Sequence, residues 1–190
     1  EVFRRQVLAL KRRGYRFETV DAYATRVGRQ ESSSRSCVLT FDDGSSDALS
    51  VLAPILDELE LCATIYVCPG LLGQPYPYVE PEARVRLLRE QELVELARRP
   101  NIEIGGHTRL HVDLSNATLE EALDEMSATR TDLERLIDRP VTTFAYPFCA
   151  YSAACPAAAE QAGYRAAVTC GMRGGSALYE LSRESIGPLD

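Results

Sequence analysis

The two histidines of the chain, His107 and His111, lie four residues apart, and an adjacent pair of carboxylates, Asp42 and Asp43, lies earlier in the sequence. Two imidazoles and one carboxylate are a common ligand set for a catalytic divalent metal, with positions left open for water and substrate. On a helical turn, the four-residue spacing would aim both imidazoles at one point. One aspartate would complete the ligand set, and the other would be available to accept a proton from an activated water.

Each cluster follows a short β-rich run: 37–41 precedes the aspartates, 102–104 precedes the histidines, and 142–144 precedes a third cluster at 146–148. Taken singly, they have ordinary structural explanations, namely a turn, a pair on a surface helix and the end of a strand. The carboxyl ends of parallel strands meet at one rim, where α/β proteins build their sites. The joint occurrence of the clusters therefore predicts a site.

Strand and helix signals alternate along the chain, which predicts a mainly parallel sheet with helices outside. The fold class is α/β, as a distorted (β/α) barrel of about seven parallel strands that need not be complete. The helix at 119–137 has the clearest pattern, because Thr118 and Glu121 form a capping box before it. The expected strands are 37–41, 63–67, 102–104, 141–146, 165–169 and a short one near 184–186, and the expected helices are 2–13, 50–59, 89–98, 119–137 and 156–162.

The composition argues against a nucleic-acid partner and against a membrane span. The net charge is −7, from 21 basic and 28 acidic residues, and phosphate binding needs clustered Lys and Arg. No apolar run approaches the roughly 20 residues that cross a bilayer. We expect one domain over 1–190, cut from a longer protein, because the chain starts at Glu1 without Met or a signal pattern. The compartment, cell envelope or cytoplasm, and the oligomeric state stay open. The one dense basic group is interpreted as a solvated helix face: Arg4, Arg5, Lys11, Arg12 and Arg13.

The six cysteines include no CxxC pair, so we expect reduced, buried thiols, with a disulfide set as the alternative. Cys149 lies beside the third cluster, but no spare histidine could activate it as a nucleophile, so we expect it to be a bystander. Tyr76 and Tyr78 lie among prolines within 71–88, a stretch that we expect to be a loop. They would either pack within the loop or form an edge that stacks on a sugar.

Three segments together resemble the first three motifs of the polysaccharide deacetylases (carbohydrate esterase family 4, the NodB-homology domain), in the branch with a Phe-Ala-Tyr-Pro third motif. Residues 163–168 and 181–183 resemble later landmarks of that family, so the resemblance covers about 2–187. The three segments are Thr40-Phe41-Asp42-Asp43-Gly44, His107-Thr108-Arg109-Leu110-His111 and Phe144-Ala145-Tyr146-Pro147-Phe148.

The resemblance implies a distorted (β/α) barrel that removes N- or O-acetyl groups from a carbohydrate by attack of a metal-activated water. It implies one divalent ion, zinc before cobalt, manganese or nickel, and an acetylated carbohydrate as the partner. By the matching motifs, Asp42 is the catalytic base, and the metal and the backbone N–H of Phe148 stabilise the oxyanion. The implied metal ligands are Asp43, His107 and His111, and the implied substrate-binding residues are Tyr146 and Pro147.

The chain departs from the family pattern at three places. Ala145 stands where the third motif often carries an arginine that tunes the base, and Cys149 stands in place of a glycine. No third histidine is present to act as the general acid; Tyr146 and Asp113 are the substitutes within the chain. Relatives of this branch carry a Tyr-His strand upstream, so we expect a missing N-terminal segment to supply the donor. Two other functions stay open: a carbohydrate-binding relative with weak or no turnover, and hydrolysis of a small non-sugar amide.

Overall fold

The computed structural model describes residues 2–32, 34–76, 85–171 and 177–186. Its centre is a six-stranded sheet in the order β3-β4-β5-β6-β7-β8, in which all neighbouring strands are parallel. A separate parallel pair, β1 (Arg16–Glu18) and β2 (Ser36–Val38), lies at the beginning of the chain. The strands of the central sheet are β3 (Thr40–Phe41), β4 (Ala63–Val67), β5 (Ile102–Gly106), β6 (Thr143–Ala145), β7 (Ala166–Cys170) and β8 (Leu181–Arg183).

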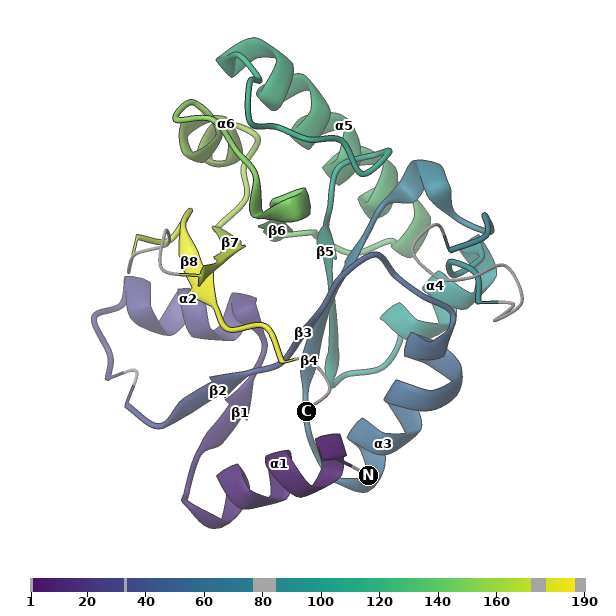
Figure 1. The fold of residues 1–190 in the computed structure, drawn as a ribbon, viewed down its shortest axis with the longest axis vertical. Helices are drawn as coiled ribbons and strands as arrows, with labels where there is room; N and C mark the ends of the chain where they lie inside the picture. Colours follow the sequence, from purple (N-terminus) through teal and green to yellow (C-terminus); the bar gives the residue numbers. More distant parts are fainter. Residues whose placement is uncertain (1, 33, 77–84, 172–176, 187–190) are drawn as a thin grey trace.

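Helices cover the outside of this curled sheet, so that the molecule is an open α/β barrel (Figure 1). The predicted fold class is confirmed, with six strands in the continuous sheet where about seven were expected. Within the described residues, no helix is long and apolar enough to cross a membrane. The helices are α1 (Val2–Arg12), α2 (Val20–Gly28), a π-helical turn η1 (Ala48–Leu52) that continues into α3 (Ala53–Glu58), α4 (Glu90–Ala97), α5 (Leu119–Ile137) and α6 (Cys155–Gln161).

The longest helix, α5, begins and ends where its sequence signals place it. The Thr118 hydroxyl accepts from the Glu121 N–H at 3.2 Å, and the Glu121 carboxylate accepts from the Thr118 N–H at 2.9 Å. Its apolar stripe packs into the main core, where Met126 and Leu133 are fully buried. The helix ends at Asp138, whose left-handed conformation (φ 52°) stops the helical hydrogen bonding.

Two strand predictions are corrected by the pairing. The expected strand 37–41 changes partner at Leu39: β2 pairs with β1, whereas β3 pairs with β4. The last strand lies at 181–183, three residues before the expected 184–186, because Leu181 is the residue whose side chain is buried, opposite Val168 of β7. The elements β1 and α2 were not predicted.

A partly buried carboxylate joins α2 to the sheet. Glu103 of β5 accepts from the Asp21 N–H of α2 at 3.0 Å and from the Thr64 and Thr143 hydroxyls at 2.8 and 2.5 Å. Burial raises the pKa of Glu103, although these hydrogen bonds act in the opposite direction. Thr64 and Thr143 belong to the strands on either side of β5, so the contact closes the end of the sheet opposite the clusters.

The two edge strands of the sheet, β3 and β8, are bridged by a side chain. In the described part of the chain no backbone pairing joins these two strands. Arg183 of β8 reaches across to β3, where it donates to the Thr40 hydroxyl at 3.1 Å and to the Asp42 carboxylate. The open side of the barrel is therefore linked at the rim that carries the three polar clusters.

Candidate metal centre

Asp43, His107 and His111 come together at the carboxyl ends of β3 and β5, as the sequence predicts. One potential ligand atom from each lies within 4.8 Å of the other two. The Nε2 atoms of His107 and His111 lie 3.5 and 3.2 Å from the Asp43 Oδ1 atom. A cation placed among three such atoms would meet two nitrogen ligands and one oxygen ligand, which is a set that zinc and its first-row neighbours accept.

Asp43 is aimed by a reversal of the chain after β3. Asp43 and Gly44 are both left-handed, with φ of 69° and 72°, so the backbone turns as the strand ends. The Tyr76 hydroxyl donates to Asp43 Oδ2 at 2.8 Å, which leaves Oδ1 buried and without a hydrogen-bond partner among the described residues. Burial acts to raise the pKa of Asp43, but the two imidazoles and the Tyr76 hydroxyl outweigh it and hold the pKa far below its usual range.

His107 is fixed in the tautomer that a metal requires. Its ring is buried, and Nδ1 lies 2.7 Å from the Ala145 carbonyl oxygen of β6. A carbonyl only accepts, so Nδ1 carries the proton and Nε2 presents a lone pair toward Asp43. A lone pair that faces a buried carboxylate oxygen is unfavourable unless a proton or a metal cation lies between them. The residues present therefore fit a divalent metal.

His111 approaches from a loop, so the expected helical turn between the histidines is wrong. Thr108 and His111 are left-handed, with φ of 58° and 56°, which no α-helix allows. The Thr108 hydroxyl accepts from the Val112 N–H at 3.0 Å and holds this loop closed. The two rings nevertheless meet edge to face, 4.9 Å between centroids.

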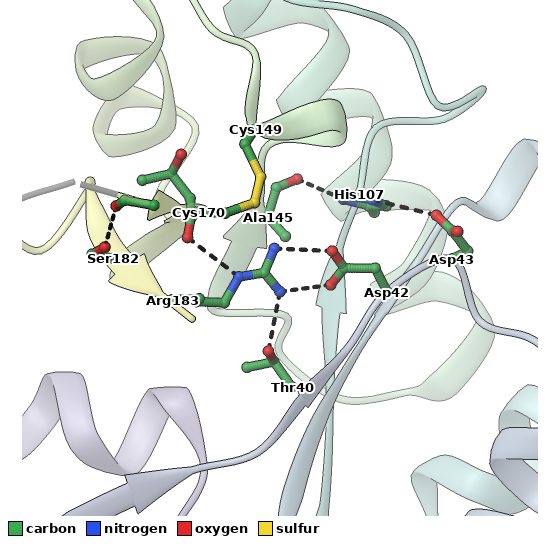
Figure 2. Close-up of a disulfide and its surroundings, with 11 residues drawn as sticks. Thr40, Asp42, Asp43, His107, Ala145, Cys149, Cys170, Ser182 and Arg183 are labelled. Carbon is green, nitrogen blue, oxygen red and sulfur yellow. Dashed lines mark hydrogen bonds and ion pairs between the residues drawn. A yellow bond between two sulfur atoms is a disulfide. The ribbon is translucent and has the colours of Figure 1, made fainter. Parts of the chain in front are cut away.

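Asp42, the neighbour of the predicted ligand, faces a different partner. Arg183 donates to its two carboxylate oxygens at 2.7 and 2.9 Å, in a forked ion pair (Figure 2). The guanidinium also lies 5.7 Å from the centre of the Tyr66 ring, and Nε donates to the Thr169 carbonyl at 3.4 Å. Ala145 leaves the third motif without an arginine, and Arg183 of another strand brings a guanidinium to the same carboxylate.

Sequence analysis noted Arg183 only as part of a family landmark. The residue is 141 positions from Asp42, and no local pattern pairs two positions so far apart. No sequence signal placed it on the rim, because the last strand was expected near 184–186, after Arg183, whereas β8 ends at Arg183. Tyr76 was missed for a similar reason, because its hydroxyl contact with Asp43 depends on how a loop folds back. Tyr78 lies outside the described residues.

Phe148 forms an exposed turn beside the histidines. Its backbone is left-handed (φ 56°, ψ 9°), and its ring meets the edge of His111 at 4.4 Å between centroids. Its N–H donates to no acceptor in the described ranges of the chain, and the residue is 59% exposed. The predicted oxyanion donor is therefore free to bind a ligand next to the metal cluster.

Tyr146 and Pro147 lie behind that turn, where both are buried. The Tyr146 ring stacks on Tyr151 at 4.4 Å, and its hydroxyl donates to the Tyr179 carbonyl at 3.0 Å. Burial is the main cause that raises the pKa of Tyr146 far above its usual range. The structure thus brings Phe148 to the surface of the site but does not bring the Tyr146 and Pro147 side chains there.

The expectation of six reduced cysteines is wrong for two of them. Cys149, next to Phe148, forms a disulfide with Cys170 at the end of β7, with their Cα atoms 5.5 Å apart. The pairing depends on β6 and β7 being neighbours, which the spacing of 21 residues does not reveal. The other four are free thiols, as expected, but only Cys68 and Cys155 are buried, whereas Cys37 and Cys62 are partly exposed.

Comparisons with known proteins agree with this geometry. A family model for polysaccharide deacetylase matches residues 29–167. The protein YxkH of Bacillus subtilis (strain 168), which is named for the same class, is 27% identical over 179 residues. The match covers 92% of this chain, but the chain spans only 60% of the length of that curated relative.

Solved structures of deacetylases share the fold. The Streptococcus pyogenes deacetylase PplD in complex with acetate is 24% identical with a TM-score of 0.78, and the match covers 95% of this chain and 78% of that one. IcaB from Ammonifex degensii is 19% identical with a TM-score of 0.83, and the match covers 98% and 83% of the two chains. These likenesses establish the (β/α) barrel architecture.

Proposed function

The chain belongs to the polysaccharide deacetylase family, and we propose that it hydrolyses acetyl groups on a carbohydrate with a divalent metal held by Asp43, His107 and His111. The observation that carries the proposal is the convergence of these three side chains at the rim of the barrel, with Nε2 of His107 directed at an Asp43 oxygen that accepts no hydrogen bond. We assign the catalytic domain to residues 1–190. Zinc suits the nitrogen and oxygen ligands best, with cobalt, manganese and nickel as alternatives.

A bound divalent cation at this position would supply Lewis-acid activation of a water and of the acetyl carbonyl. Asp42 is the base that accepts the proton of the attacking water. Its two oxygens are held by the fork of Arg183 at 2.7 and 2.9 Å, and each oxygen keeps a second lone pair for the proton. The side chain is 35% exposed, so a water molecule can reach it.

The N–H of Phe148 binds the oxygen that becomes negative as the acetyl carbon turns tetrahedral. A backbone donor held in place before the reaction stabilises that charge without reorganisation. The buried Tyr146 and Pro147 support this turn from behind. The Phe148 ring and Leu110 are both 59% exposed beside the histidines and offer an apolar edge to a sugar.

The proton for the leaving group must come from elsewhere than Tyr146 or Asp113. Tyr146 is buried, and its hydroxyl donates to a carbonyl. Asp113 accepts from the Ser115 hydroxyl and N–H, which lower the pKa of its carboxyl and keep it ionised at neutral pH. An amine cannot leave without a proton, whereas a good alkoxide or phenolate can, so we expect residues 1–190 to cleave acetyl esters faster than acetamides.

Because neither Tyr146 nor Asp113 can donate this proton, a second candidate is a carbohydrate-binding relative with little turnover. Release of acetate from a chromogenic acetyl ester and from N-acetylglucosamine oligomers separates the two functions. The protein is stripped with chelator, reloaded with zinc, cobalt, manganese or nickel, and compared with Asp42→Asn. Metal-dependent turnover that Asp42→Asn loses supports the deacetylase. Sugar binding without turnover of either substrate would favour the second function.

A further inference from the structure

We propose that the Cys149–Cys170 disulfide is a positioning crosslink of the proposed active site, so that reducing it lowers turnover without releasing the metal. The inference rests on the proposed function for its rate measurement. The location of the bond comes from the structure alone. The bond joins the turn of Phe148 to β7, and β7 pairs with β8, the strand that carries Arg183. Figure 2 shows the disulfide from Cys149 to Cys170, drawn above the Arg183 side chain.

The turn at Phe148 has an unfavourable backbone conformation. Phe148 and Cys149 are consecutive left-handed residues, with φ of 56° and 55°. This conformation is unfavourable for side chains with a Cβ, and two in succession need the surroundings to hold them. Two backbone hydrogen bonds help: Cys149 N–H to the Tyr146 carbonyl at 3.1 Å, and Ala150 N–H to the Pro147 carbonyl at 2.9 Å.

Packing holds the start of this turn, where Tyr146 and Pro147 are buried, but it holds Phe148 itself less, because that residue is 59% exposed. The disulfide therefore restrains the residue next to the proposed oxyanion donor. Losing the bond frees the turn to relax toward a more favourable backbone conformation, which would move the Phe148 N–H. A displacement of about 1 Å in a positioning element can cost a factor of about 100 in rate.

The other end of the disulfide, Cys170, lies beside Arg183. Cys170 is paired with Arg183 in the register of β7 and β8, and the Arg183 Nε donates to the carbonyl of the preceding residue, Thr169. The Ser182 hydroxyl donates to the Gly171 carbonyl just beyond Cys170. The end of β7 is thus bound to the strand whose arginine holds Asp42. One covalent bond couples the proposed oxyanion donor to the support of the proposed base.

The proposed metal ligands belong to other segments, because Asp43 follows β3 and both histidines follow β5, and only the ring of Phe148 and the Ala145 carbonyl touch the histidines from the linked segment. Reduction should therefore separate metal binding from turnover. A trialkylphosphine is the suitable reductant, since a dithiol would compete for the metal. The phosphine attacks one sulfur and breaks the S–S bond; water supplies the two thiol protons and the oxygen of the phosphine oxide, and the disulfide gains the two electrons that phosphorus loses.

The experiment compares the metal-loaded oxidised protein with the same protein after phosphine treatment. We expect kcat to fall by about 10-fold. The loss is smaller than the roughly 100- to 1,000-fold cost of removing an oxyanion donor, because reduction displaces the Phe148 N–H but does not remove it. Bound metal should not change, and amide hydrogen exchange in the peptide around 146–152 should accelerate. Cys170→Ala should behave like the reduced protein. Cys37→Ala, which removes a free thiol far from the turn along the chain, should keep the oxidised rate and the response to phosphine.

Glycine at position 149 distinguishes positioning from general stabilisation. Glycine adopts left-handed φ without penalty, so Cys149→Gly should turn over faster than Cys149→Ala although both lack the disulfide. Equal rates and equal exchange before and after reduction would overturn the proposal, as would free thiols at Cys149 and Cys170 in protein purified under oxidising conditions. If the oxidised protein has no turnover, the proposed function fails. The crosslink is then tested by hydrogen exchange alone: faster exchange at 146–152 on reduction supports it, and unchanged exchange overturns it.

Discussion

Replacing Arg183 should reduce turnover while leaving the metal in place. The guanidinium makes two charge-assisted hydrogen bonds to Asp42, at 2.7 and 2.9 Å, and only 16% of its side chain is exposed. Hydrogen bonds to charged groups are worth about 1.5–3 kcal/mol each. Asp42 is 35% exposed, and water would replace part of what is lost. We therefore expect the loss of both hydrogen bonds to raise the activation free energy by about 1.5–3 kcal/mol. This corresponds to about a 10- to 100-fold loss in kcat/KM for Arg183→Met.

Arg183→Lys is the matched control for this substitution. A lysine keeps the positive charge but cannot engage both carboxylate oxygens in a fork, so its rate should lie between those of the wild type and Arg183→Met. The assay is acetate release from an acetyl ester at saturating metal, with bound metal measured on the same samples. An Arg183→Met protein that folds, binds metal and keeps the wild-type kcat/KM would refute the assignment of Arg183 as the residue that positions the base.

Four further substitutions test other features of the protein. Asp42→Asn should keep the metal and lose about 100-fold or more in turnover, whereas Asp43→Asn should lower metal content; exchanged phenotypes would reverse the roles of the two aspartates. Burial raises the pKa of Glu103 above its ordinary 4.5, so the folded state binds that proton more tightly and the protein loses stability as pH rises from about 4.5 through the raised value. Glu103→Gln, which stays neutral, should flatten this dependence of Tm on pH, and an unchanged slope would contradict it. Thr118→Ala should lower the free energy of unfolding in urea by about 1 kcal/mol through loss of the α5 cap, and no loss would mean that the cap contributes nothing.

The elements predicted well from the sequence are those whose signals are local. The limits of α5 follow from Thr118 and the Glu121 capping box, and those of β4 follow from the apolar run 63–67 between turn residues. The convergence of Asp43, His107 and His111 was predictable because strand ends meet at one rim in parallel α/β folds. That rule requires only the order of the elements along the chain.

The features that the sequence missed depend on contacts between distant segments. The Arg183–Asp42 pair crosses the open side of the barrel, and the Cys149–Cys170 bond needs β6 and β7 to be neighbours. The helical turn expected between the histidines was wrong because left-handed backbone at Thr108 produces a loop with the same side-chain convergence. Spacing alone cannot separate the two, since both bring residues four apart to one point.

The central claim is that Asp43, His107 and His111 hold one catalytic metal ion. The most direct test is the metal content of purified protein, measured by mass spectrometry for the wild type and for His107→Ala after equilibration with zinc and removal of excess metal. The account predicts about one divalent ion per chain in the wild type and little in the variant, with acetyl-ester hydrolysis lost in parallel. Full metal content in a folded His107→Ala protein would contradict it.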